Sequence, residues 1–422
     1  MDIFRIEGPV RLKGSVRING SKNASLPIMA ACILAVGRSR LSGVPNLSDI
    51  SVCSELLNRV GCKVTRQDSG EMCIDATVVD NPIGEYDIVR KMRAGICVLG
   101  PLLARCGRAE VSMPGGCAIG DRPVDIHLRG LRNLGAKIYI KNGYIVAEAP
   151  RGLRGDEIFM GGPFGSTVLG TANLMMAATL AKGRTIIESA ACEPEVVNLA
   201  NFLNTMGAKI CGIGSPRLTI EGVKELRSVE FEVIADRIEA GTFMVAAAIT
   251  GGELKLKNCR LGDMMAVVDK LRAIGIKVEQ MNGGCVVERR GRLKPTDVTT
   301  HPYPGFPTDL QAQFMALLAL ARGNSIIIEK VFPDRFMHVA ELNRMAADLR
   351  KEGPTVIVAG VKKLMAAPVM ASDLRASAAL VLAGLAAEGT TIVNRVYHID
   401  RGYERIEARL NPVGAKIVRE SA

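Results

Sequence analysis

Residues 112–125 combine a thiol, three charged groups and several glycines and prolines in one run, Ser-Met-Pro-Gly-Gly-Cys-Ala-Ile-Gly-Asp-Arg-Pro-Val-Asp. The glycines and prolines predict a loop rather than a core strand. Cys117 lies in this loop, five positions before Arg122. An exposed thiol near a cation has a lowered pKa and is more nucleophilic. We therefore interpret Cys117 as a candidate chemical residue; the alternative is a loop cysteine without a role.

Three cationic residues lie at the starts of predicted units or in loops. Lys22 follows Asn19-Gly20-Ser21 and leads into a helix predicted from about Ala24, where backbone N–H groups suit an anion. Arg93 precedes the apolar run 94–104, and Arg401 lies in the polar run 398–405. The simpler interpretations are a solvated lysine at a helix cap, a surface arginine and the salt-bridged start of a helix.

Acidic residues precede three apolar helical runs: Asp236, Asp309 and Asp373. Each could cap its helix, which is a common duty of aspartate. If the apolar helices of the chain pack in parallel, the polar residues at their starts converge. Six helix N-termini facing one cleft would then attract an anion strongly.

The remaining reactive residues favour no metal site and no bound cofactor. The four histidines (His127, His301, His338 and His398) are far apart in the sequence, and no Walker A, G-x-G-x-x-G or G-x-S-x-G string is present. The 11 cysteines form no C-x-x-C pair, and Cys117 alone has a sequence context that predicts exposure. The others are expected mostly as buried apolar residues of a reduced, cytoplasmic protein.

The net charge and the aromatic content of the chain limit the kinds of molecule that it is expected to bind. The net charge is +11, aromatic residues make up 4% and tryptophan is absent. A basic surface favours anionic partners such as nucleic acid, a membrane surface or small phosphorylated substrates. Few aromatic residues make stacking on nucleic acid bases unfavourable. No run reaches the roughly 20 apolar residues of a membrane span, and no secretory signal is visible in the first residues.

Two markers repeat six times along the chain. The string L-x-x-(apolar)-G-x-K-(Ile/Val) places its glycine at positions 61, 135, 207, 275 and 414, with a degenerate copy carrying Ala346. An apolar helical run that ends in glycine and leads into an aliphatic strand places that glycine at positions 37, 107, 183, 252, 323 and 389. Glycine is favoured after a helix because it adopts the left-handed conformation easily. Two markers in step indicate six units of about 70 residues.

Each unit is predicted as helix, strand, helix, strand. The first helices, such as 168–180 and 310–320, are apolar on all sides and should be buried, with sheets outside them. Six units exceed one core, so we expect three per domain: an N-terminal domain over 22–234 that carries the Cys117 loop, and a C-terminal domain over 1–21 and 235–422. Two strand-like pieces, 4–7 and 15–18, are expected to pair with the C-terminal half. The active site is expected in the cleft between the domains.

Several specific strings resemble the UDP-N-acetylglucosamine enolpyruvyl transferases of the EPSP synthase superfamily, from residue 8 to residue 417. They are Gly20–Ala24, Pro114–Gly120, Arg122–Asp125, Phe306–Gln313, Arg335–His338, Asp373–Ser377 and Arg401–Glu404. The resemblance implies a pair of inside-out α/β barrels, three repeats each, with helices within and sheets outside. This agrees with the repeat count that the markers give.

The resemblance also implies a reaction and its residues. The sugar 3-hydroxyl attacks the central carbon of phosphoenolpyruvate as the methylene carbon is protonated, and the tetrahedral intermediate then loses phosphate. By resemblance, Cys117 is the general acid and the target of fosfomycin, with Lys22 an alternative proton donor, and Asp309 takes the hydroxyl proton. Phosphoenolpyruvate is expected at Lys22, Asn23, Arg122 and Arg401, with Lys22 and Arg401 counted as catalytic. The sugar nucleotide is expected at Asn23, Arg93, Arg122, Pro123, Val124, Asp125, Ile126, Gly165, Asp309 and Val331.

One departure concerns the loop that opens the third unit. Members of the family often carry a lysine there, whereas residues 161–166 read Gly-Gly-Pro-Phe-Gly-Ser. Backbone N–H groups could replace that lysine. Two other functions remain as alternatives: a 3-phosphoshikimate 1-carboxyvinyltransferase and a basic, non-enzymatic protein that binds nucleic acid. Our prediction is an enzyme with small-molecule substrates, monomeric, without nucleic acid or membrane partners.

Overall fold

The computed structural model describes residues 2–114 and 124–421, so Cys117, Arg122 and Pro123 lie outside the described residues. The described chain divides into two compact units. The N-terminal unit comprises residues 20–114 and 124–234, and the C-terminal unit comprises residues 2–19 and 235–421. None of the helices in these ranges combines the length and the hydrophobicity that a bilayer crossing requires.

Within the described residues, six four-stranded sheets share one pattern: an edge strand runs parallel to its neighbour, and the other pairs are antiparallel. The N-terminal unit holds three of them. They are β18(Glu230–Glu232)-β4(Arg38–Ser42)-β6(Met72–Asp75)-β5(Lys63–Arg66), β7(Ile83–Gly84)-β8(Arg108–Ser112)-β10(Tyr144–Glu148)-β9(Lys137–Lys141) and β11(Glu157–Phe159)-β14(Arg184–Glu188)-β16(Arg217–Glu221)-β15(Lys209–Cys211). Two short pairs, β12(Gly161–Gly162)-β13(Gly165–Ser166) and β17(Leu226–Arg227)-β3(Ala35–Val36), complete this unit.

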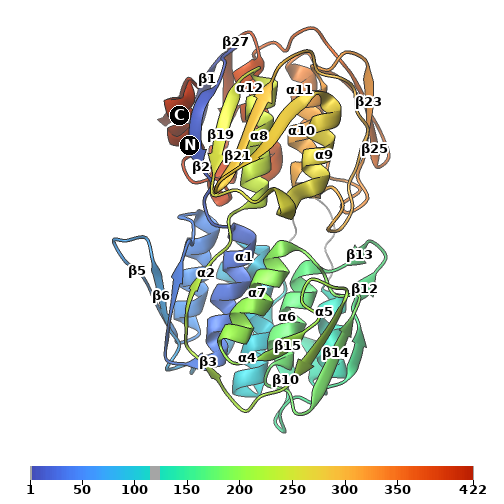
Figure 1. Cartoon of the computed structure of the whole chain (residues 1–422). Coiled ribbons are helices and arrows are strands. Elements are labelled where there is room, and N and C mark those ends of the chain that lie inside the picture. The colour runs from blue at the N-terminus through green and yellow to red at the C-terminus, as the bar shows by residue number, and fades with distance from the viewer. Residues whose placement is uncertain (1, 115–123, 422) are drawn as a thin grey trace. The chain divides into compact units, whose positions relative to one another are not determined.

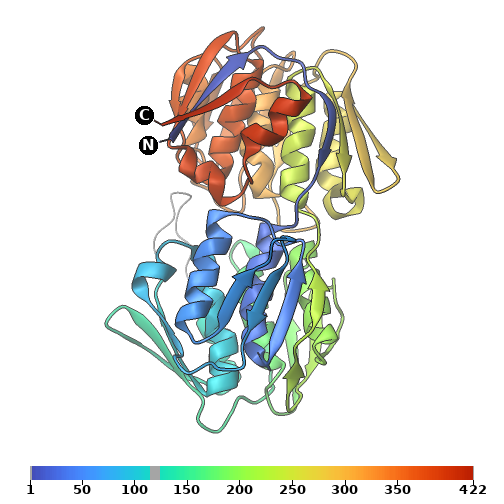
Figure 2. The same cartoon turned by 90° about the vertical axis from the view of Figure 1, so that its left-hand side faces the viewer.

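The C-terminal unit repeats the pattern with help from the start of the chain. Its sheets are β2(Lys13–Arg17)-β19(Glu253–Lys257)-β21(Gly284–Arg289)-β20(Ile276–Met281), β22(Val298–Thr299)-β23(Asn324–Ile328)-β25(Thr355–Ala359)-β24(Asp348–Glu352) and β26(Pro368–Met370)-β27(Gly389–Asn394)-β1(Asp2–Gly8)-β28(Ile417–Ser421). The expected pairing of the first residues with the C-terminal half is confirmed. Figure 2 shows blue β1 among the red strands from the end of the chain.

The first helix of each repeat fills the interior of its own unit. These helices are α1(Lys22–Ala31), η2(Arg93–Val98) with α4(Leu99–Cys106), α6(Val168–Ala178), α8(Arg237–Ile249), η4(Thr308–Leu310) with α10(Gln311–Leu318), and α12(Leu374–Ala386). Nearly every residue of α1, α6, α8, α10 and α12 is buried. In the C-terminal unit α8, α10 and α12 pack on one another inside the sheets (Figure 1). The predicted order, helices within and sheets outside, is confirmed.

The second helix of each repeat is shorter or amphipathic and leads into the repeat's last hairpin. These helices are α2(Ser48–Arg59), α5(Asp125–Asn133), α7(Pro194–Thr205), α9(Met265–Ile274), α11(His338–Arg344) and α13(Ile406–Leu410). The remaining short helices are α3(Tyr86–Val89), η1(Cys32–Leu34), η3(Leu261–Met264), η5(Val396–Arg401) and η6(Asn411–Val413). Each unit buries one aliphatic core between its inner helices and its sheets.

The repeat markers have the backbone conformation that was predicted for them. Gly61, Gly135, Gly207, Gly275 and Gly414 all have φ between 90° and 108°, and Ala346 has φ 63°. One position of the second marker was wrong. Gly251, with φ 67°, takes the left-handed conformation in place of Gly252. Gly252 is needed for another reason, since a Cβ there would lie 2.1 Å from the carbonyl oxygen of Leu12.

Candidate functional site

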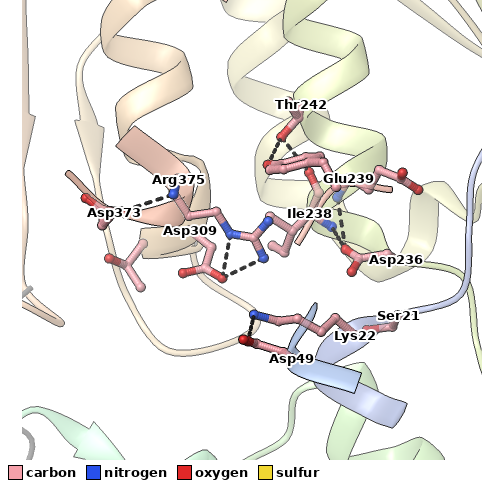
Figure 3. A network of polar contacts seen from close by, with 12 residues as sticks. Ser21, Lys22, Asp49, Asp236, Ile238, Glu239, Thr242, Asp309, Asp373 and Arg375 are labelled. Carbon is pink, nitrogen blue, oxygen red and sulfur yellow. Dashed lines mark hydrogen bonds and ion pairs between the residues drawn. The ribbon is translucent and has the colours of Figure 1, made fainter. Parts of the chain in front are cut away.

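Asp309 lies in η4, directly before the buried helix α10, and its carboxylate binds two arginines. Arg335 donates to Oδ1 over 2.8 Å. Arg375 donates from Nε to Oδ2 over 3.1 Å, as Figure 3 shows. The arginine side chains are only 8% and 2% exposed. Neither η4 nor α10 has a side-chain cap, so the capping interpretation of Asp309 is wrong. Its carboxylate is instead an ionised acceptor held in place by two guanidinium groups.

A second, fully buried carboxylate holds the segments beside Asp309. Glu329 accepts hydrogen bonds from the hydroxyls of Thr300 (2.6 Å) and Thr308 (2.9 Å) and from the backbone N–H of Val331 (2.9 Å). Thr308 also accepts from Arg335 over 3.1 Å. The half-buried Val331, which was expected to contact the sugar nucleotide, therefore belongs to the same unit and the same hydrogen-bonded group as Asp309.

Asp236 and Asp373, unlike Asp309, cap helices. Asp236 accepts from the N–H groups of Ile238 and Glu239 at the start of α8, and Asp373 accepts from those of Arg375 and Ala376 at the start of α12. Each carboxylate satisfies N–H groups that a helix start leaves without partners and offsets the partial positive charge there.

The N-terminal ends of α8, α10 and α12 lie together within the C-terminal unit. Gln313 of α10 donates to Thr242 of α8 over 3.1 Å, and the Thr242 hydroxyl lies 2.8 Å from that of Tyr403. The Tyr403 ring lies under the Arg375 guanidinium of α12, 5.4 Å from its centroid. The expected convergence of polar helix starts is thus confirmed for these three helices.

Burial changes the charge states around Asp309. His338 is 1% exposed, and burial lowers its pKa to about 4 against a smaller raising effect of Asp373, so the ring is neutral near pH 7. Burial acts in the same direction on Arg375, but its interactions with the Tyr403 hydroxyl and the Asp309 carboxylate outweigh burial and leave the pKa of Arg375 raised. Burial also raises the pKa of Tyr403. The group around Asp309 thus contains fixed arginine charges beside neutral histidine and tyrosine side chains.

Lys22, in the N-terminal unit, is the first residue of α1 and is only 8% exposed. Its Nζ lies 3.2 Å from a carboxylate oxygen of Asp49, in the first turn of α2 (Figure 3). Ser21 caps α1 by accepting from the N–H of Ala24. The solvated interpretation of Lys22 is therefore wrong: it is a buried cation at a helix start. Asn23 follows it and is half-buried.

The other expected nucleotide contacts of the N-terminal unit lie at the starts of elements. Half-buried Arg93 opens η2, and exposed Asp125 opens α5. Val124 is buried directly before α5. Ile126, the second residue of α5, approaches the β12–β13 hairpin, because a Cβ on Gly162 would lie 2.7 Å from its side chain.

The hairpin β12–β13 is the loop that lacks the family's lysine, and it carries exposed Gly165. Arg129 of α5 donates to the carbonyl oxygens of Phe159 and Gly161 over 3.0 and 3.1 Å. An arginine from the neighbouring repeat thus fixes the base of this hairpin and brings it beside Ile126.

Arg401 lies at the end of η5 in the C-terminal unit and is half-buried. The predicted helix start at 398–405 is wrong, since η5 ends at Arg401 and α13 begins only at Ile406. Arg405 has φ 42°, a left-handed conformation that a continuous helix does not allow.

Sequence reasoning overlooked three charged residues that the structure brings to the predicted ones: Asp49, Arg335 and Arg375. Arg335 and Arg375 lie in strings that support the family resemblance, so the sequence drew attention to them, but no role was predicted for either residue. Asp49 gave no signal, because it looks like an ordinary acid in the first turn of a helix.

The cysteine prediction needs one correction. Seven of the ten described cysteines are buried, as expected: Cys32, Cys53, Cys62, Cys73, Cys97, Cys259 and Cys285. Cys106 and Cys211 are exposed, although the sequence context did not predict exposure for either of them. Cys106 is the last residue of α4 and Cys211 is the last residue of the edge strand β15. The types of the neighbouring residues did not indicate the exposure of either thiol.

Comparisons with known proteins identify the family. The family model described as EPSP synthase (3-phosphoshikimate 1-carboxyvinyltransferase) matches residues 6–410. A UDP-N-acetylglucosamine 1-carboxyvinyltransferase of Methylacidiphilum infernorum is 53% identical over 419 residues, 99% of either chain. A protein of the same name from an Anaeromyxobacter species is 53% identical over 425 residues, with both chains fully covered.

Solved structures share the fold at lower identity. The enolpyruvyl transferase NikO from Streptomyces tendae superimposes with a TM-score of 0.91 at 23% identity, covering 100% of this chain and 99% of that one. EPSP synthase from Acinetobacter baumannii gives a TM-score of 0.77 at 18% identity over both whole chains. The chain therefore belongs to the EPSP synthase family and, within it, to the UDP-N-acetylglucosamine 1-carboxyvinyltransferases.

Proposed function

We propose that the protein transfers the enolpyruvyl group of phosphoenolpyruvate to the 3-hydroxyl of UDP-N-acetylglucosamine and releases phosphate. The observation that carries this proposal is the identity of about 53% over the whole chain with relatives named for this transfer. The reaction is the first committed step of peptidoglycan synthesis. It needs no cofactor, because the donor already carries an activated carbon–oxygen bond to phosphate.

The proposed chemistry proceeds by addition and elimination. The sugar oxygen bonds to the central carbon of phosphoenolpyruvate, its proton passes to Asp309, and the methylene carbon gains a proton. The intermediate then loses that methyl proton and the phosphate, leaving the enol ether. We assign the proton donor as Cys117, with Lys22 as the alternative. A positioned acid or base typically contributes about 10²–10⁴ in rate.

The geometry around Asp309 supports its role in positioning and accepting the hydroxyl proton. Two buried arginines orient the carboxylate, and Gln313 binds the backbone carbonyl of Asp309 over 3.0 Å. A general base must be held within hydrogen-bond reach of its proton. A rigid carboxylate at the start of α10 meets this need better than a mobile surface residue.

Binding of the donor requires fixed cations, since phosphoenolpyruvate carries a phosphate and a carboxylate. We assign this task to Lys22, Asn23, Arg122 and Arg401. Buried Lys22 at the start of α1 supports it, because a helix N-terminus and an ammonium group favour the same anion. For the sugar nucleotide we assign Asn23, Arg93, Arg122, Pro123, Val124, Asp125, Ile126, Gly165, Asp309 and Val331.

Phosphate release tests the reaction directly. The purified protein is incubated with phosphoenolpyruvate and either UDP-N-acetylglucosamine, shikimate 3-phosphate or no acceptor, and free phosphate is measured. We expect release only with UDP-N-acetylglucosamine. Release with shikimate 3-phosphate alone would assign the protein to the other transferase named by the family model.

We further propose that the protein is a cytoplasmic monomer without a nucleic-acid partner. A steep salt dependence of binding to generic RNA would instead favour a nucleic-acid partner.

The role of the thiol has its own experiment. We expect Cys117→Ala to lose nearly all turnover and to resist covalent labelling by fosfomycin, followed by mass spectrometry of the intact protein. Cys211→Ala, which removes an exposed thiol from an edge strand, is the matched control. Full labelling of the Cys117 variant would show that another cysteine reacts.

A further inference from the structure

Arg419 of β28 contacts three carboxylates and one aromatic ring. Its two terminal nitrogens donate to both oxygens of Asp400 over 3.0 and 2.6 Å. Its Nε donates to Glu407 over 3.1 Å, and a third carboxylate, Asp2, lies 3.3 Å away. The guanidinium also covers the ring of Phe4, 4.8 Å from its centroid. One side chain therefore joins the strands β1 and β28 to η5 and α13.

Asp400 is the residue directly before Arg401, the proposed donor-binding arginine at the end of η5. Tyr403, two residues beyond Arg401, is held from another side: its hydroxyl lies 2.8 Å from Thr242, and its ring lies under Arg375. The backbone of Arg401 is thus fixed between two anchors. One anchor is the group around Asp309, and the other is Arg419.

The backbone of this segment needs such anchors. Arg395, before η5, and Arg405, after it, both have positive φ, 60° and 42°. Left-handed backbone is unfavourable for residues other than glycine, by roughly 1–2 kcal/mol each. The 3₁₀-helix between them has weaker hydrogen-bond geometry than an α-helix. Local propensity therefore does not determine where Arg401 lies, and side-chain contacts must do so.

We propose that Arg419 is a positioning residue, which acts through Asp400 to hold Arg401 in the conformation that binds the anionic groups of phosphoenolpyruvate. This inference rests on the proposed function. The bidentate hydrogen bonds from the Arg419 guanidinium fix the plane of the Asp400 carboxylate. A lysine at position 419 would bind Asp400 as a point charge without fixing this plane.

The simpler explanation is that Arg419 only stabilises the pairing of β1 with β28. The same strand pair provides a matched control for it. Arg5 and Glu420 form an ion pair across these strands, with a shortest distance of 2.9 Å and side chains 44% and 37% exposed. This pair links the same two strands without reaching Asp400, so it separates strand stability from the positioning of Arg401.

The experiment compares Arg419→Met with Arg5→Met in the phosphate-release assay, after wild-type activity has been measured. For Arg419→Met we expect the KM for phosphoenolpyruvate to rise about tenfold, the scale of a lost charged hydrogen bond. The KM for UDP-N-acetylglucosamine should change less than about twofold, as should both constants of Arg5→Met. Asp400→Asn should reproduce the Arg419→Met pattern, and it serves in its place if that variant does not fold.

A double-mutant cycle with Arg401→Gln tests whether the effect passes through Arg401. In that background, Arg419→Met should add little to the KM for phosphoenolpyruvate, because the residue that it positions is already gone. An undiminished effect in that background, or equal changes in both KM values, would overturn the positioning role. Absence of UDP-N-acetylglucosamine-dependent phosphate release in the wild type would instead overturn the proposed function, and this inference with it.

Discussion

The two units repeat one arrangement of three inner helices and three sheets, yet they start those helices with different chemistry. In the N-terminal unit, hydroxyls cap α1 and α6 through Ser21 and Thr167. In the C-terminal unit, carboxylates cap α8 and α12 through Asp236 and Asp373. A hydroxyl satisfies the helix N–H groups without adding charge, whereas a carboxylate also offsets the partial positive charge of the helix start.

The different caps of the inner helices indicate how the same repeat can provide two electrostatic environments. Uncharged caps keep the partial positive charge of the helix starts in the N-terminal unit, which agrees with our proposal that this unit binds substrate phosphates. In the C-terminal unit, acids and buried arginines bind one another, as in the group of Asp309, Arg335 and Arg375, and so hold a carboxylate in a fixed orientation. We therefore propose that the same fold serves anion binding in one unit and proton acceptance in the other.

The largest effect should come from removing the charge of Asp309. We expect Asp309→Asn to lower kcat by about 10²–10⁴, the usual contribution of a positioned base, with a much smaller change in the affinity for the sugar nucleotide. Steady-state kinetics and calorimetric titration measure the two effects. Asp348→Asn, at an exposed position in the same unit, is the control. An unchanged rate would reduce Asp309 to an ion-pair partner of its arginines.

Breaking the buried pair of the N-terminal unit should be the largest effect on stability. Asp49→Asn leaves the ammonium group of Lys22 buried without this counter-charge, and we expect a loss of about 3–5 kcal/mol in the free energy of unfolding. Urea denaturation followed by circular dichroism gives the value. Asp75→Asn breaks the more exposed pair with Arg38 and should cost less than about 1 kcal/mol. Similar losses for both variants would contradict the special role of Asp49.

Lowering the pH should reduce the stability of the C-terminal unit, because protonation of His338 favours the unfolded chain. Its pKa is about 4 when folded and 6.5 in its ordinary state. Between those values the unfolded chain binds a proton that the folded chain does not, so stability falls as the pH falls from 6.5 to 4, by up to about 3 kcal/mol.

Urea midpoints measured from pH 7 to pH 4.5 test this dependence. The variant His338→Gln should lose less stability over that range than the wild type. The variant His301→Gln, at an exposed position, should follow the wild type. Parallel pH profiles for all three proteins would show that another group is responsible.

Exchanging the type of cap tests the comparison itself. Thr167→Asp gives α6 the carboxylate cap of the C-terminal unit close to the β12–β13 hairpin. We expect the KM for UDP-N-acetylglucosamine to rise about tenfold through repulsion of its phosphates, while the helix is stabilised by a few tenths of a kcal/mol. Thr167→Ser keeps an uncharged cap and should bind normally. Equal KM values for the two variants would remove the electrostatic distinction between the units.

The smallest effect concerns the one repeat marker that is not glycine. Ala346 has φ 63° at the position where the other repeats have glycine. We expect Ala346→Gly to stabilise the protein by about 0.5–1 kcal/mol, after the greater entropy of glycine in the unfolded chain is subtracted. The reverse change, Gly135→Ala, meets no neighbouring atom but keeps the strained φ of 90°, so it should destabilise. Denaturation midpoints that move in the same direction would contradict this account.

The repeats could be predicted because backbone conformation limits residue choice locally. A second regularity of the same string was overlooked. The residue after its leucine is always asparagine or arginine, and its side chain binds the backbone of the strand six positions later. Asn204, for example, binds both the N–H and the carbonyl of Ile210. This clamp explains why helix and strand keep a constant separation in all six repeats.

The partners of the site residues could not be predicted in this way. Asp309 meets Arg375 because α10 and α12 pack side by side, and it meets Arg335 from the loop before α11. These arginines lie 66 and 26 residues from Asp309 in the sequence, so no local pattern indicates either contact. For the same reason, Asp309 looked like a helix cap. Asp236 and Asp373 accept hydrogen bonds from N–H groups two and three residues further along the chain, so the sequence could predict these two residues correctly as helix caps.

The place of β1 between β27 and β28 has a consequence for synthesis on the ribosome. The first strand emerges first, but its neighbours at residues 389–394 and 417–421 emerge last. At about 5–20 residues per second, residues 235–422 take roughly 10–40 s to follow the complete N-terminal unit. During that interval Phe4 and Ile6 have no sheet to enter. Release of an unfinished chain would leave a folded half trailing an apolar, aggregation-prone strand.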